Sequence, residues 1–200
     1  MHHLQIEYLK ELMNIAVGAS TAIIADILDA FGSMNIPEVE VLTPKKFLDD
    51  MAHYFDADKT YYTCKQNFNG MFSGEALFVL DEVSSINLSK HMYKKDSPEL
   101  HEINDSVQEL SNIINATLIG KIVENLETDV QFSVPSTLSI KGDNIVSKEK
   151  LAAYHKIIMI KTSMRFETED ITATVMILTK DNSIAKLKLL IESKLEELFS

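Results

Sequence analysis

The chain has 200 residues, of which 46% are hydrophobic, and it carries a formal net charge of −11 with Arg165 as its sole arginine. This composition allows a sizeable core, whereas the acidic balance disfavours nucleic acids and anionic membranes as partners because both attract basic surfaces. Apolar runs stay shorter than the ~20 residues that cross a bilayer, so we expect no membrane insertion and look to proteins as partners.

Helix and strand signals alternate through the first half of the chain. Apolar residues at helical spacings predict an amphipathic helix from about Gln5 to Ala30. Strands are then predicted at Glu38 to Leu42, Lys59 to Gln66 and Glu75 to Leu80. Pro44 and several charged residues predict a loop or short helix over Thr43 to Asp58, and a Ser-capped helix is predicted over Ser84 to Lys95.

The second half repeats this order. Ser97 is a suitable helix cap and Pro98 suits a first helical turn, so a helix or a pair of helices is predicted from there towards Glu127. A last helix is predicted after Asp181. Strands are predicted at Thr137 to Ile140, Lys156 to Thr162 and Ile171 to Thr179. Each half is a helix followed by strands, which predicts an α+β fold with a largely antiparallel sheet.

A polar pattern also recurs between the halves, at an offset of about 98 residues. The polar and proline pairs are Glu7 with Asp105, Glu11 with Glu109, Asn14 with Asn112 and Pro37 with Pro135. The apolar pairs at the same offset include Leu12 with Leu110, Ile36 with Val134 and Leu80 with Leu178. Two copies of so long a unit indicate one pseudo-two-fold domain over 1–200, built of repeats at about 1–97 and 98–200, and not a solenoid array.

Each polar triplet occupies one face of its predicted helix. Residues i, i+4 and i+7 of a helix lie within about 60° of one another and form a single stripe. We call the two stripes the first motif, Glu7, Glu11 and Asn14, and the second motif, Asp105, Glu109 and Asn112. Gly18 and Ala116 continue the stripes with small side chains, which would let another macromolecule approach closely. We expect two exposed, motif-bearing helices that act as docking faces.

A Glu combined with an Asn suits one kind of chemistry. A side-chain amide neither ionises nor attacks at neutral pH, but it accepts and donates hydrogen bonds and can hold a water in line for attack. Phosphoryl hydrolysis can use such an amide, because its loose transition state needs positioning and no covalent help. The phosphoryl group and its divalent cation would then be supplied by a partner, with the Glu carboxylate pairing to a lysine there.

The doubled pattern Asp/Ser-x-x-x-Glu-x-x-Asn, followed after 22 residues by Pro, resembles the CheC/CheX/FliY phosphatases of bacterial chemotaxis, which remove the aspartyl phosphate from the response regulator CheY. Two motif copies in 200 residues make the chain look most like CheC. Glu7 stands where the family pattern has Asp or Ser, and Ala116 stands where the second motif commonly has Gly.

The resemblance implies a catalytic function and its residues. Glu11 and Asn14 would form one site, and Glu109 and Asn112 the other. The implied substrate is a phosphorylated CheY-like regulator, and the deamidase CheD, with which CheC proteins pair, is a second candidate partner. A hydrolase of this kind needs no cofactor of its own, since Mg²⁺ is expected on the regulator.

Other residue types suggest structural roles. The histidines form no short-range ligand motif, so we expect no metal site on this chain. Cys64, the only cysteine, is expected to pack in the core, and with no secretory signal at the N-terminus it predicts a reducing, cytoplasmic location. Pro37 and Pro135 are expected to fix the backbone at the entry to a strand.

A non-catalytic binding module is the alternative to an enzyme. A flagellar-switch-like scaffold of the same fold, or a regulator of CheD, would use the same faces without hydrolysis. The Glu and Asn present in both motifs favour the phosphatase, and a third option, an unrelated metal hydrolase, has no ligand set to support it.

Overall fold

The computed structural model describes residues 2–29, 32–147, 151, 155–179 and 181–199. The α-helices in these ranges are α1 (His3–Leu28), α2 (Pro44–Tyr54), α3 (Glu82–Tyr93), α4 (Leu100–Asn125) and α6 (Asp181–Phe199). The strands are β1 (Gly32–Met34), β2 (Glu38–Leu42), β3 (Thr60–Gly70), β4 (Gly74–Asp81), β5 (Val130–Phe132), β6 (Ser136–Lys141), β7 (Ile157–Phe166) and β8 (Ile171–Thr179), and one short 3₁₀ turn, η1 (Gly142–Asn144), follows β6.

These strands form one eight-stranded sheet in which every described pairing is antiparallel. The order is β1-β7-β8-β4-β3-β5, with β2 also on β7 and β6 also on β3. It is symmetric about the β8 and β4 pair. The first-half strands β1 and β2 complete the second half's side of the sheet, and β5 and β6 do the same for the first. The α+β, pseudo-two-fold prediction is confirmed.

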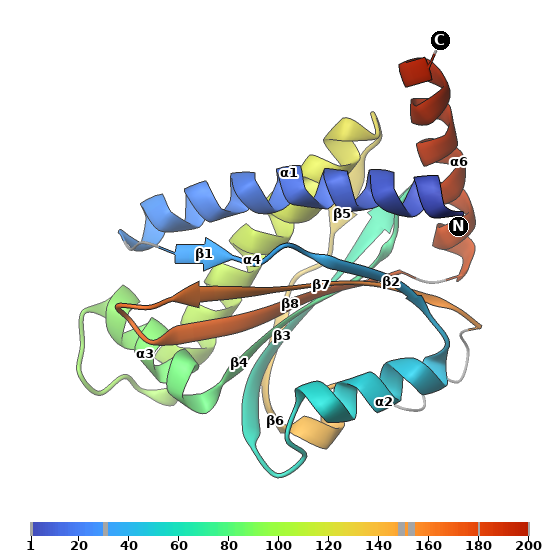
Figure 1. Ribbon diagram of the computed structural model, residues 1–200. Coiled ribbons are helices and arrows are strands. Elements are labelled where there is room, and N and C mark those ends of the chain that lie inside the picture. Colours follow the sequence, from blue (N-terminus) through green and yellow to red (C-terminus); the bar gives the residue numbers. More distant parts are fainter. Residues whose placement is uncertain (1, 30–31, 148–150, 152–154, 180, 200) are drawn as a thin grey trace.

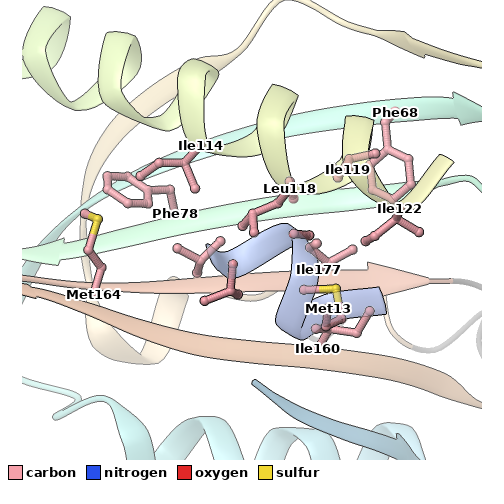
Figure 2. Packing of buried hydrophobic residues seen from close by; sticks show 14 of the residues in the cluster. Met13, Phe68, Phe78, Ile114, Leu118, Ile119, Ile122, Ile160, Met164 and Ile177 are labelled. Carbon is pink, nitrogen blue, oxygen red and sulfur yellow. The ribbon is translucent and has the colours of Figure 1, made fainter. Parts of the chain in front are cut away.

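Helices cover both faces of the curled sheet (Figure 1). α1 and α4 pack against each other across one face, and the core beneath them gathers Met13, Phe78 and Leu118 with strand residues such as Ile177 (Figure 2). α2 covers the opposite face, where Phe47 enters a second apolar cluster. Burial of these apolar faces fixes the polar faces of α1 and α4 towards solvent.

Cys64 and several methionines lie in the core of the protein. Cys64 is fully buried in the cluster under α1 and α4, as predicted for a packing residue. Met13, Met159, Met164 and Met176 are buried too. Flexible, unbranched methionines suit the irregular gaps between a helix layer and a twisted sheet. Among the described residues, none of the helices is long and apolar enough to span a bilayer.

The predicted start of α4 is wrong by two residues. The helix begins at Leu100, and Glu99 is its cap, so Ser97 and Pro98 precede it. Glu102 Oε2 accepts a hydrogen bond from the Glu99 N–H at 2.6 Å, and a carboxylate there also complements the positive helix end. The sequence beyond forms one continuous helix to Asn125 and not a pair.

Other boundaries differ for similar local reasons. α3 is capped by Asp81, whose carboxylate accepts from the Ser84 N–H at 2.7 Å, so the serine lies inside the first turn and is not the cap. The stretch from Thr43 to Asp58 contains a short helix, α2, and α1 ends at Leu28, with position 30 outside the described residues. The three-residue strands β1 and β5 were not predicted, since they are too short for alternation to be visible.

The number of residues that separates equivalent positions of the two halves changes along the chain. Thr162 Oγ1 donates to the Asn35 carbonyl at 2.7 Å, and Gln66 Nε2 donates to the Ser133 carbonyl at 3.1 Å. Asn35 and Ser133 are 98 residues apart, but Thr162 and Gln66, which make the equivalent bond, are 96 apart. Strands β3 and β7 are thus shifted by two residues relative to the motif helices.

The predicted match of Leu80 with Leu178 is wrong, because the two leucines face opposite sides of the sheet. Leu80 joins the core beneath α1 and α4, whereas Leu178 packs against the cluster on the α2 side of the sheet. Successive side chains of a strand point to opposite faces, so an equivalent pair must share a face. The helical match of Leu12 with Leu110 does hold, because both are buried in the same core.

Truncating a buried residue of α4 should cost far more stability than truncating its exposed neighbour. Leu110→Ala should lower the free energy of unfolding by about 2–5 kcal/mol, because the lost side chain leaves a cavity; Leu110 is 1% exposed. The adjacent exposed residue gives the control, Glu109→Ala, with an expected change below about 0.5 kcal/mol. Denaturant unfolding measures both, and equal losses would contradict this packing of α4.

Candidate functional site

Both motifs lie on exposed helical faces. Glu7, Glu11 and Asn14 of the first motif are exposed on α1, and the three residues of the second motif are exposed on α4. Gly18 and Ala116 are exposed one turn further along, and a Cβ on Gly18 would meet nothing within 4 Å. The expected stripes are therefore present twice, on two helices that pack side by side.

An exposed aliphatic residue precedes each motif proline. Ile36 is 82% exposed and Val134 is 87% exposed, and the prolines that follow, Pro37 and Pro135, lead directly into β2 and β6. Such large exposed apolar side chains at matching positions favour contact with another protein. The matching positions of Ile36 and Val134 are visible in the sequence, but the sequence does not show whether such a matching apolar pair is exposed or buried.

Buried polar groups support the second motif from below. Gln66, on β3 and only 2% exposed, donates from Nε2 to Asn112 Oδ1 at 3.0 Å as well as to the Ser133 carbonyl. Its Oε1 accepts from Asn115 Nδ2 at 3.1 Å, and Asn115 also donates to Ser111 Oγ at 3.2 Å. The sequence analysis missed this network, which joins α4 to β3.

The first motif lacks such support. Met13 and Val17 occupy the positions of Ser111 and Asn115, and Thr162 occupies that of Gln66. Within the part of the chain that the structure describes, the Asn14 side chain has no hydrogen-bond partner. The two sites thus share their exposed residues but differ in the residues beneath them.

The acidic residues of the motifs are mostly available to a partner. Glu7 pairs with Lys10 at 2.9 Å, and the hydrogen bond from Lys10 lowers the pKa of the Glu7 carboxyl, which keeps it charged as the pH falls. Neither Glu11 nor Glu109 has a hydrogen bond or ion pair to any described residue. Each can therefore accept a cation from outside, with little to displace beyond water.

The described residues offer no site of their own for a metal. No group of three or more His, Cys, Asp or Glu side chains among them is arranged to hold an ion. The exposed motifs consist of carboxylates and an amide, without a His, Ser, Thr or Cys, so the chemistry that they suit best is hydrogen bonding and charge pairing.

Comparison with known proteins shows similarity to chemotaxis phosphatases. A family model described as "Chemotaxis phosphatase CheX" matches residues 62–159, a segment that includes the second motif. FliY of Thermotoga maritima has the same fold over 97% of this chain and 98% of its own (TM-score 0.73, 14% identity). CheX of Desulfovibrio desulfuricans aligns over 85% and 99% (TM-score 0.57, 16% identity). Residues 62–159 of the chain are thus similar to the CheX chemotaxis phosphatases, and the chain as a whole has the fold of FliY and CheX.

This family fold is shared more widely. FliM of the FliM-SpeE complex from H. pylori aligns over 96% of this chain and 97% of its own, with a TM-score of 0.65 and 11% identity. No curated protein sequence gives a significant match. At such low identities the structural likenesses establish the fold, so the CheC/CheX/FliY-type function of the chain has to be argued from its motif residues.

The isolated chain should not act on small phosphate esters. It should bind Mg²⁺ negligibly and leave p-nitrophenyl phosphate intact, because the motifs supply hydrogen bonds and charge without a metal or nucleophile. Calorimetric titration with Mg²⁺ and a colorimetric turnover assay measure the two properties. Strong, metal-dependent turnover would contradict a site that needs a partner to complete it.

Proposed function

We propose that this chain is a phosphatase that hydrolyses the aspartyl phosphate of a CheY-like response regulator. The observation that carries the proposal is made in both halves: an exposed Glu that has no hydrogen-bond or ion-pair partner among the described residues is followed, three residues later on the same helical face, by an exposed Asn. The match of residues 62–159 to a chemotaxis phosphatase family model supports this reading.

The proposed reaction is a hydrolysis in which the amide positions the water. The water oxygen bonds to phosphorus while the bond from phosphorus to the regulator's aspartate oxygen breaks, and its electron pair stays on the carboxylate. Both water protons leave with inorganic phosphate. Asn14 or Asn112 would hold the water in line by hydrogen bonds, which supplies orientation without covalent chemistry. Mg²⁺, carried by the regulator, would stabilise charge on the phosphoryl oxygens.

The remaining exposed residues suit docking. Glu11 and Glu109 would each pair with a lysine of the regulator, since both carboxylates lack a partner among the described side chains. Ile36 and Val134 would add apolar contact beside the prolines. The regulator and CheD are both proposed as partners, and the cytoplasm is the proposed location.

A non-catalytic scaffold is the second candidate. The likeness to FliM favours it, because that protein shares the fold over nearly the whole of both chains. A scaffold would need the docking residues but not the amides. Replacing the two asparagines therefore separates the two functions.

Replacing both asparagines should remove hydrolysis with little loss of binding. Asn14→Ala combined with Asn112→Ala should slow regulator dephosphorylation by on the order of 100-fold, corresponding to about 2.7 kcal/mol of barrier. Glu11→Ala combined with Glu109→Ala should instead weaken binding to the phosphorylated regulator. Phosphate-decay and binding assays on both double variants make the comparison. A double Asn variant as fast as wild type would exclude the water-positioning role.

Two separate sites predict partial activity in each single variant. Asn14→Ala and Asn112→Ala, made individually, should each retain hydrolysis, because α1 and α4 present complete motifs of their own. Both side chains are exposed, so melting temperatures should be unchanged and cannot explain a loss. Near-complete inactivation by either single change would indicate one composite site.

A further inference from the structure

The two halves differ most beneath their motif asparagines. We propose that Gln66 is a positioning residue for Asn112, and that it makes the second motif the faster of the two sites; this inference rests on the proposed function. Gln66 does not reach the surface, so it would act through Asn112 and not on the substrate.

One backbone carbonyl determines the orientation of the whole network. The Ser133 carbonyl can only accept, so the Gln66 atom facing it at 3.1 Å must be Nε2. The same Nε2 faces Asn112 at 3.0 Å, where only Oδ1 can accept. Gln66 Oε1 then accepts from Asn115. Asn112 Nδ2 and the second lone pair of Oδ1 therefore remain available to a water and a phosphoryl group.

A held amide is better prepared for reaction than a free one. The Asn112 side chain is exposed, yet its oxygen is anchored to a buried donor that water does not easily displace. Less rotational freedom is then lost when the water and phosphoryl group are aligned. Asn14 has no such anchor among the described residues, since Thr162 makes only the equivalent of the Ser133 bond.

The network also carries a cost that suggests a role beyond stability. Asn115 is fully buried, and its Oδ1 accepts no hydrogen bond from any residue that the structure describes. An unpaired buried oxygen is destabilising, and the first half avoids it with Val17 at the same position. Holding Asn112 in one orientation accounts for why the polar set occurs beneath the second motif.

The test places beneath the second motif the residues that lie beneath the first. Gln66→Thr with Asn115→Val reproduces Thr162 and Val17, a combination that already packs in this fold and keeps a donor for the Ser133 carbonyl. In an Asn14→Ala chain, where only the second motif acts, this pair should lower kcat for regulator dephosphorylation about tenfold. KM should not change, because Glu109 is untouched.

The matched control is the same pair in an Asn112→Ala chain. There only the first motif acts, so its rate should not change; an equal fall in both backgrounds would reveal a general structural effect and overturn the proposal. Gln66→Met, which keeps the volume of the side chain but removes its polar atoms, repeats the test if the pair destabilises the fold.

A readout independent of activity completes the test. Side-chain amide ¹⁵N relaxation of the free protein should show Asn112 ordered and Asn14 mobile, with Asn112 becoming mobile in the Gln66→Thr, Asn115→Val pair. Equal mobility of the two amides in wild type, or equal rates of the Asn14→Ala and Asn112→Ala chains, would overturn the inference. A wild-type chain that hydrolyses no regulator phosphate would overturn the proposed function, while the relaxation data would still show whether Gln66 holds Asn112.

Discussion

Burial of the apolar faces of α1 and α4 against one side of the sheet is the constraint on which both motifs depend. A helix that buries one face must turn the other outward, and the residues at i, i+4 and i+7 fall on that outward face in both halves. Leu9 and Leu110 hold their helices in the core while the motif side chains stay exposed. The polar stripes can therefore carry function without bearing on the stability of the core.

The sheet makes the two halves interdependent although their sequences repeat. Since β1 and β2 pair with β7, and β5 and β6 pair with β3, each half supplies two strands to the other. The segment before each of β2 and β6 thereby lies against a strand of the opposite half, as the bonds of Thr162 to Asn35 and Gln66 to Ser133 show. A residue of one half can thus support the motif of the other half, as Gln66 of the first half does for Asn112 of the second motif.

Helices, most strands and both exposed stripes could be predicted from sequence, because periodic burial and a fixed spacing are local properties. β2 and β8 match their predicted ranges to the residue. The Gln66 and Asn112 contact could not be predicted, since it joins residues 46 positions apart and the sheet register had shifted from 98 to 96. The spacing of 98 residues likewise made Leu80 and Leu178 look equivalent, although they face opposite sides of the sheet. Pairings across a sheet depend on register, which residue spacing alone does not encode.

A structure of this chain bound to its regulator, held in the phosphorylated state by Mg²⁺ and beryllofluoride, would test the central claim most directly. The exposed motif face of α4 should lie against the regulator, with the Asn112 amide beside the beryllofluoride, a regulator lysine opposite Glu109 and Gln66 still bonded to Asn112. A regulator bound elsewhere, with both motif faces left open to solvent, would contradict the account.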